Sequence, residues 1–264
     1  MKKLPIRKES LPLCAFKRYH LPPVTEPQKE PGRLTIGDTV RVVGSVSQEG
    51  TLARLTVRNE QDCDVVEVRV DLIGAYARHS PGTEPTWLKH AQAIEARGVP
   101  VVVTVRLTAE GGKWMQPDEL RLPIFQEALS RLAAADIELR SAIVEQVSEL
   151  ARQHKRALIV SHHDFNRTPP LEELRVIVDK ASRYGTVVKV ATIVRTEEDL
   201  ATLRALLAEK RPMPLCLLGM GPLGLQTRVE FPKLGSCLTY GYLDQPVAPG
   251  QVPARELMRQ LHGK

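Results

Sequence analysis

Residues 157–191 read ALIVSHHDFNRTPPLEELRVIVDKASRYGTVVKVA and carry the clearest secondary-structure signal in the chain. Short apolar, β-branched runs at 157–162 and 186–191 are typical of strands buried in a parallel sheet. The segment between them, 169–184, opens with prolines and acidic residues and stops at Gly185, as helices do. The stretch therefore predicts a strand, a helix and a second strand in succession.

The same alternation runs from residue 34 to the C-terminus. Strands are expected at 41–46, 64–70, 99–105, 135–139, 157–162, 186–191, 214–218 and 236–240. Helices are expected at 86–96, 118–133, 141–154, 169–184, 196–210 and 254–261, with weaker candidates at 52–61 and after Gly221. Eight strands alternating with helices on 264 residues predict an α/β fold, the (β/α)₈ or TIM barrel. An open doubly wound sheet is the alternative, and the absence of GxGxxG after the first strand argues against its dinucleotide-binding form.

The first 33 residues differ from the rest in composition. They hold six of the 20 prolines, and their eight Lys/Arg against three Asp/Glu give a net charge of +5 out of +6 for the chain. We interpret residues 1–33 as an extended or disordered basic arm and residues 34–264 as one barrel domain. Because the barrel domain is close to neutral and lacks nucleic-acid-binding motifs, we expect no nucleic-acid partner.

The cysteines and the hydropathy of the sequence predict the cellular compartment of the protein. Cys14, Cys63, Cys216 and Cys237 form no CxxC pair, and the last three lie in or beside apolar runs, which favours buried reduced thiols. No apolar stretch of about 18 residues predicts a membrane span, and the basic N-terminus lacks the apolar core of a secretory signal. The expected location is the cytoplasm.

In a (β/α)₈ barrel, the carboxyl ends of the strands and the loops after them form the active site. Lys189 lies within TVVKVA among apolar neighbours. A lysine within a strand is rarely tolerated without a partner or a task, and desolvation would favour its neutral, nucleophilic amine. The alternative is a lysine on an edge strand that extends its amine to solvent.

A histidine pair follows the strand 157–162. His162 and His163 are adjacent, so their side chains should point to opposite faces and cannot both enter one pocket without a bend. One catalytic imidazole is therefore a better interpretation than a metal pair, because imidazole transfers protons near neutral pH. A hydrogen-bonding structural histidine is the alternative.

Charged residues also follow other strands. Alternation places Glu67, Arg69 and Asp71 of EVRVD on one face, where they can bind a polyhydroxylated ligand or form a structural ion-pair cluster. Arg106 ends the TVR strand, and Glu110 precedes two glycines on the loop after it.

The C-terminal part offers further candidates for ligand contacts. Arg228 can hold a carboxylate with paired hydrogen bonds. Gln251 follows a Pro-Gly turn and can donate at the barrel mouth.

In this order, the motifs resemble type I 3-dehydroquinate dehydratase. The pattern of that family is an E-x-R-x-D strand, a T-x-R strand with an E-G-G loop, an S-x-H-D-F strand end, a V-K-x-A strand and a terminal A-P-G-Q. The corresponding segments are EVRVD at 67–71, TVR at 104–106, EGG at 110–112, SHHDF at 161–165, VKVA at 188–191 and APGQ at 248–251. LTIGD at 34–38 is similar to the family's N-terminal hairpin, which closes the barrel bottom.

The resemblance implies a role for each matching residue. Lys189 matches the lysine that forms a Schiff base with the substrate ketone, His163 the general acid/base, and Glu110 the residue that orients the histidine. The residues that match substrate contacts are Ser45, Glu67, Arg69 and Arg106 for the hydroxyls and Arg228 and Gln251 for the carboxylate. Val247 is a departure, since the family commonly has a small hydroxyl residue there.

The resemblance also implies the reaction and the partners. It points to dehydration of 3-dehydroquinate in the shikimate pathway without a metal or organic cofactor, by an enzyme that often forms homodimers. Another Schiff-base barrel, such as an aldolase, would use Lys189 but need not keep the S-x-H-D-F and A-P-G-Q motifs. A ligand-binding barrel without turnover is the third possibility, and the intact set of Lys189, His163 and Glu110 argues against it.

Overall fold

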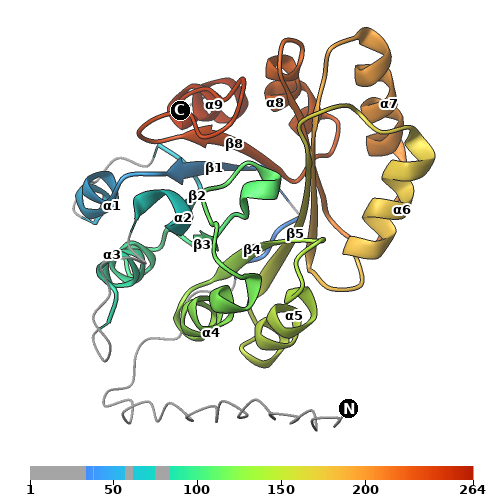
Figure 1. The fold of residues 1–264 in the computed structure, drawn as a ribbon. Coiled ribbons are helices and arrows are strands. Elements are labelled where there is room, and N and C mark those ends of the chain that lie inside the picture. The colour runs from blue at the N-terminus through green and yellow to red at the C-terminus, as the bar shows by residue number, and fades with distance from the viewer. Residues whose placement is uncertain (1–33, 38, 57–61, 75–83, 264) are drawn as a thin grey trace, which may run out of the picture.

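The computed structural model describes residues 34–37, 39–56, 62–74 and 84–263. Eight parallel strands form one sheet that curls into a nearly closed barrel with helices outside it, a (β/α)₈ barrel (Figure 1). The strands are β1 (Arg41–Val46), β2 (Val65–Arg69), β3 (Val101–Thr104), β4 (Ala134–Glu138), β5 (Ala157–Asp164), β6 (Val187–Ile193), β7 (Leu215–Met220) and β8 (Leu238–Tyr242). The α-helices of the described residues are α1 (Glu49–Leu55), α2 (Val70–Ile73), α3 (Thr86–Glu95), α4 (Leu122–Arg131), α5 (Val144–Gln153), α6 (Leu171–Ala181), α7 (Glu197–Ala208), α8 (Gly224–Lys233) and α9 (Ala254–His262).

The barrel prediction is confirmed, and the differences are local. Val70, expected as the last residue of a strand, begins the short helix α2, which ends at Gly74 with a φ of 65°. The expected helix 118–133 is divided into a 3₁₀ turn at Asp118–Arg121 and α4. Residues 34–37 contain no strand, and residues 1–33 lie outside the described residues, so the N-terminal hairpin and the arm stay predictions.

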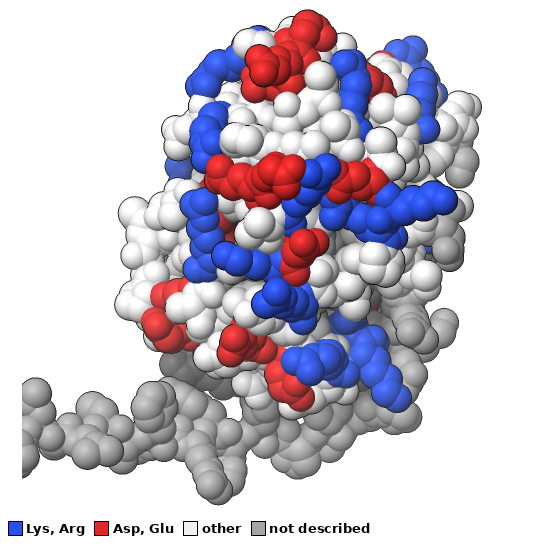
Figure 2. Space-filling view, turned by 90° about the vertical axis from the view of Figure 1, so that its right-hand side faces the viewer, with Lys and Arg blue, Asp and Glu red and all other residues white. Residues whose placement is uncertain are grey.

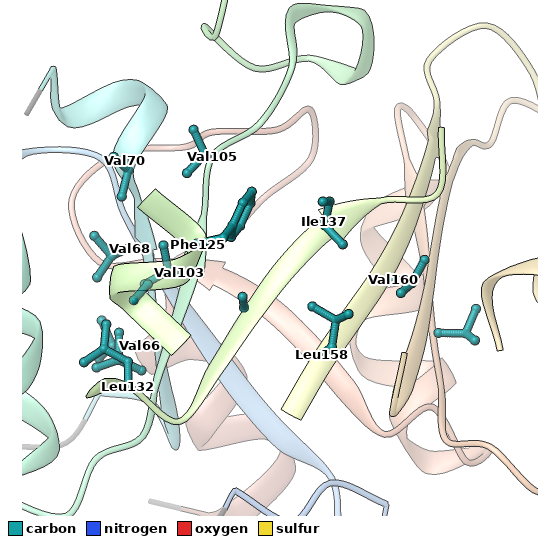
Figure 3. Close-up of a cluster of buried hydrophobic side chains, with 14 of the residues drawn as sticks. Val66, Val68, Val70, Val103, Val105, Phe125, Leu132, Ile137, Leu158 and Val160 are labelled. Carbon is teal, nitrogen blue, oxygen red and sulfur yellow. The ribbon is translucent and has the colours of Figure 1, made fainter. Parts of the chain in front are cut away.

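Strand alternation separates two apolar layers. Outward side chains such as Val68, Val103 and Ile137 pack with Phe125 of α4 between the sheet and the helices (Figure 3). Inward side chains near the amino ends of the strands, such as Val43 and Ile159, form a second cluster that includes Leu34. Burial of both faces of each strand explains the nearly continuous apolar runs in the sequence.

The inward face changes from apolar to charged along the strands. In β4, Ala134 is followed on the same face by Asp136 and Glu138, and all are buried. In β6, the inward residues Val187 and Ala191 lie on either side of Lys189. The upper part of the barrel interior is therefore polar, at the end where such barrels carry their active sites.

The junction of β7 and β8 differs from the other strand junctions. The hydrogen-bonded order runs β7-β6-β5-β4-β3-β2-β1-β8, so β7 and β8 form the two ends of the sheet. Cys237 N–H donates to Leu215 O at 2.9 Å, and the hydroxyl of Ser236 accepts Leu217 N–H at 2.9 Å. Ser236 was expected as the first residue of the last strand, but its side chain takes the place of a main-chain partner, and β8 begins at Leu238.

The outer face at α6 and α7 carries intermixed positive and negative side chains (Figure 2). Ion pairs here include Arg175 of α6 with Glu209, which follows α7, and Arg204 of α7 with Glu230 of α8. None of the helices in the described ranges combines the length and apolar character needed to span a membrane.

Candidate active site

Lys189 lies inside the barrel with only 5% of its surface exposed. It belongs to β6, which pairs with β5 on one side and β7 on the other, so the edge-strand alternative is wrong. Its Nζ lies 3.0 Å from Oδ2 of Asp136 and 3.9 Å from the centroid of the Tyr240 ring. The buried amine therefore contacts a carboxylate and an aromatic face.

Asp136 links the amine to a second cation. Its Oδ1 accepts hydrogen bonds from Arg106 Nη2 at 2.7 Å and from Ser161 Oγ at 2.6 Å. Burial alone would raise the pKa of Asp136, but the charges of Arg106 and Lys189 hold it well below its usual range. Asp136 is therefore ionised at neutral pH and balances two buried cations.

Glu110 holds the imidazole of His163. Its Oε2 lies 2.8 Å from His163 Nδ1 and accepts the main-chain N–H of His163 at 3.0 Å. When Glu110 is ionised, its oxygens can only accept hydrogen bonds, so the proton between the two groups belongs to Nδ1 and Nε2 keeps a free lone pair. Burial, with the nearby charges of Arg106 and Lys189, lowers the pKa of His163 well below 6.5, so the ring is a neutral base at pH 7.

Steric contacts require glycine at the two positions after Glu110. Gly111 has a φ of 80°, and a Cβ on it would lie 2.5 Å from Phe165 Cζ. A Cβ on Gly112 would lie 2.0 Å from the carbonyl oxygen of Arg106. The loop can bring Glu110 to His163 only with glycine at these positions.

A polar network joins β1, β2, β3 and the last loop. Glu67 accepts the hydroxyls of Ser45 at 2.6 Å and Thr104 at 2.8 Å. Gln251 donates to Ser45 Oγ at 3.3 Å, and its Oε1 accepts Val247 N–H at 2.8 Å. Gln251 thus connects the loop that contains Val247 to the polar lining of the barrel.

The remaining arginines have different partners. Arg69 forms a two-bond pair with Asp71, with Nε–Oδ1 and Nη2–Oδ2 distances of 3.0 and 2.8 Å. Arg228, on α8, donates to the carbonyl oxygens of Gly250 and Tyr240, both at 2.9 Å. Among the described residues no Asp or Glu forms an ion pair with Arg228, and burial lowers its pKa to about 10. A buried guanidinium of this kind is suited to a ligand carboxylate.

A comparison with protein-family models assigns this chain to a family. The model described as type I 3-dehydroquinase matches residues 40–263, which include every residue of the site described above. The chain belongs to this family.

Relatives within the family are close enough to align over most of their length. A 3-dehydroquinate dehydratase from Methanocella arvoryzae is 36% identical over 199 residues, covering 75% of this chain and 86% of the relative. The crystal structure of 3-dehydroquinate dehydratase from Geobacillus kaustophilus has a TM-score of 0.74 at 25% identity and covers 88% of this chain and 96% of that one. A type I enzyme from Clostridium difficile, at 22% identity with 87% of this chain and 94% of that one covered, shares the fold with a TM-score of 0.77.

The structure brings together the residues that the sequence predicted for the site. The nine predicted residues Ser45, Glu67, Arg69, Arg106, Glu110, His163, Lys189, Arg228 and Gln251 are all buried or nearly so at the polar end of the barrel. His162 is also buried, yet strand alternation points it to the opposite face from His163, and no described residue is close enough to hydrogen-bond its Nε2. The roles of the nine residues stay predictions.

Three residues in contact with this set were not identified. Asp136, Ser161 and Tyr240 surround Lys189 and Arg106. Ser161 belongs to the SHHDF motif but was given no role, and Asp136 and Tyr240 were predicted only as strand residues. A signal was present for Asp136, because Asp136 and Glu138 alternate in an apolar strand as the charges of EVRVD do. Glu138 itself accepts Leu107 N–H at 2.8 Å and pairs with Arg121 at 2.7 Å, which fixes the start of the Glu110 loop.

Proposed function

We propose that this chain dehydrates 3-dehydroquinate to 3-dehydroshikimate, a step of the shikimate pathway, through a Schiff base on Lys189. One observation carries the proposal. A buried amine and a neutral imidazole held by a carboxylate face the interior from adjacent strands, with Lys189 opposite Ser161 and His163 opposite Ala191 in the register. The family membership and the relatives named 3-dehydroquinate dehydratase support the choice of substrate.

The first step joins Lys189 to the substrate. The ammonium of Lys189 gives up one proton, and the neutral amine attacks the ketone carbon. The ketone oxygen takes up that proton and a second one from the nitrogen and leaves as water, which gives a protonated imine. Because the cationic imine withdraws electrons from the neighbouring carbon more strongly than a ketone does, a proton on that carbon becomes more acidic.

The second step removes water from the bound substrate. His163 Nε2 takes the acidic proton, which leaves an enamine on Lys189 and an imidazolium paired with Glu110. The enamine expels the hydroxyl on the next carbon, which takes the proton from His163 and departs as water. Proton and hydroxyl leave from the same face, which makes this a syn elimination. Hydrolysis of the conjugated imine returns the ammonium of Lys189 and releases the enone.

The remaining residues bind the substrate in this proposal. Glu67, Ser45, Arg69 and Arg106 contact its hydroxyls, and Arg228 with Gln251 holds its carboxylate. No metal and no organic cofactor takes part. Closure of the Gln251 loop over the ligand would keep water away from the imine until the elimination is complete.

The test is incubation with 3-dehydroquinate and borohydride, followed by peptide mass spectrometry and an absorbance assay for the conjugated enone. An adduct on Lys189 with enone formation supports the dehydratase. An adduct without enone would favour another Schiff-base enzyme. The absence of both signals would favour a binding barrel without turnover.

We further infer a cytoplasmic homodimer. The buried, unpaired thiols of Cys63, Cys216 and Cys237 agree with a reducing compartment. The dimer rests on the family resemblance, and light scattering of the purified chain measures it directly.

A further inference from the structure

We propose that Tyr240 is a positioning residue that stabilises the protonated imine formed on Lys189 through the face of its ring. The proposal rests on the Schiff-base function above, and it adds a residue that none of the motifs includes.

The geometry of the contact is that of a cation–π interaction. Lys189 Nζ lies 3.9 Å from the centroid of the Tyr240 ring, well within the range of about 6 Å over which such contacts act. Tyr240 and Lys189 expose 4% and 5% of their surfaces, so little water screens the attraction. The interaction is therefore at the strong end of its range.

The ring is held in place independently of Lys189. Tyr240 pairs with Val43 in the ladder between β8 and β1, and its carbonyl oxygen accepts Arg228 Nη1 at 2.9 Å. The side chain packs in the inward cluster with Cys216 and Leu238. A fixed ring holds the amine at one position inside the barrel, and the approach of the amine to a ketone depends on that position.

An aromatic face can attract the protonated imine without acting as a base, which a second carboxylate could not do. The negative partner of Lys189, Asp136, is already shared with Arg106 and Ser161. The face of the ring attracts a positively charged nitrogen but carries no basic atom. It therefore cannot remove the iminium proton, and the imine keeps the positive charge that withdraws electrons. Burial raises the pKa of the Tyr240 phenol well above 10, so the side chain stays neutral throughout.

The phenol oxygen is not needed for this role. It is buried and has no hydrogen-bond partner among the described residues. Tyr240→Phe should therefore keep the contact, whereas Tyr240→Leu removes the ring and leaves an apolar side chain in the same cluster. Pentafluorophenylalanine in place of Tyr240 keeps a ring of similar shape but withdraws electrons from its face.

The experiment measures the fraction of Lys189 trapped by borohydride at fixed 3-dehydroquinate, beside kcat and KM, in the full chain and these three variants. We expect Tyr240→Phe to match the unmodified chain, and Tyr240→Leu and pentafluorophenylalanine to lower the trapped fraction and kcat by about tenfold or more. KM for the carboxylate-bearing substrate should change less than kcat.

Three results would overturn the proposal. If pentafluorophenylalanine traps as much imine as phenylalanine, the ring acts by packing alone, and this comparison holds even if Tyr240→Leu does not fold. If the unmodified chain forms enone but no trapped lysine, the Schiff-base function fails and this proposal with it. Normal trapping in the unmodified chain with no loss in the variants overturns the role of Tyr240 only.

Discussion

Lys189 and Asp136 form their ion pair across an intervening strand, since β5 lies between β4 and β6. Ser161 of β5 donates to the same carboxylate, so three neighbouring strands share one anionic centre. Removal of Lys189 still leaves Asp136 paired with Arg106, and the fold should survive the change. The role of the amine can therefore be tested in a folded protein.

Lys189→Ala should abolish imine formation and reduce turnover to background, because Lys189 is the only buried lysine among the described residues. Lys180→Ala, at an exposed position on α6, is the matched control and should behave as the unmodified chain. Borohydride trapping with mass spectrometry checks both. A trapped adduct on another lysine in Lys189→Ala would contradict the assignment.

His163→Ala should still form the imine but lose about 10²–10⁴-fold in turnover, because the general base is gone. His162→Ala is the control, since His162 lies on the opposite face of β5 and should not exchange protons with the substrate. Single-turnover trapping separates imine formation from elimination. Normal turnover in His163→Ala would show that a group other than His163 is the base.

Turnover should fall as the pH drops below about 7, because burial raises the pKa of Glu110 to about 7 against the opposing charge of Arg106. Protonation of Glu110 below that pH removes the negative charge that stabilises the imidazolium of His163. Glu110→Gln should lower kcat by about 100-fold or more and flatten this acid limb. A pH profile of kcat checks the effect, and an unchanged acid limb in Glu110→Gln would assign it to a different group.

Arg228→Ala should raise KM by about 10- to 100-fold, the usual contribution of a hydrogen bond to a charged group, with a smaller effect on kcat. Arg204→Ala, which removes a guanidinium paired with Glu230 on the outer surface, is the control. Steady-state kinetics decide the outcome. Unchanged affinity in Arg228→Ala would exclude it from the carboxylate site.

Glu95 should destabilise the fold at neutral pH. Its Oε1 accepts Val101 N–H at 2.9 Å and Ala133 N–H at 2.7 Å, while burial raises the pKa of the carboxyl from 4.5 to about 7. Because the folded state holds this proton more tightly than the unfolded chain, stability falls as the pH rises from about 4.5 through about 7.

Glu95→Gln keeps the acceptor and removes the buried charge. We expect the variant to gain about 1–2 kcal/mol at pH 8 and little at pH 4.5. Urea unfolding at the two pH values measures the difference. An equal gain at both pH values would show that the charge of Glu95 is not the cause.

Much of the barrel was predictable because strand burial on both faces leaves a strong local signal. β1 was predicted to the residue, and Lys189 stood out because its neighbours are apolar. The end of β2 was not predictable, because Val70 has the same β-branched character whether it ends a strand or begins α2.

The contacts between the site residues were harder to predict from the sequence than the residues themselves. Asp136 meets Lys189 because the staggered register sets Asp136 opposite Ile159 and Lys189 opposite Ser161. That stagger arises from closure of the barrel, and no local spacing encodes it. Tyr240 is a further case, since β8 and β6 are far apart in sequence and meet only across the interior.

The junction between β7 and β8 divides the site into halves of unequal stiffness. Lys189, His163 and Asp136 lie on strands with complete ladders on both sides. Arg228 and Gln251 lie next to the junction that Cys237 and Ser236 hold with few main-chain bonds. The strands that carry the predicted Schiff-base lysine and acid/base histidine are thus held on both sides, whereas the residues predicted to hold the ligand carboxylate lie beside the more weakly bonded junction.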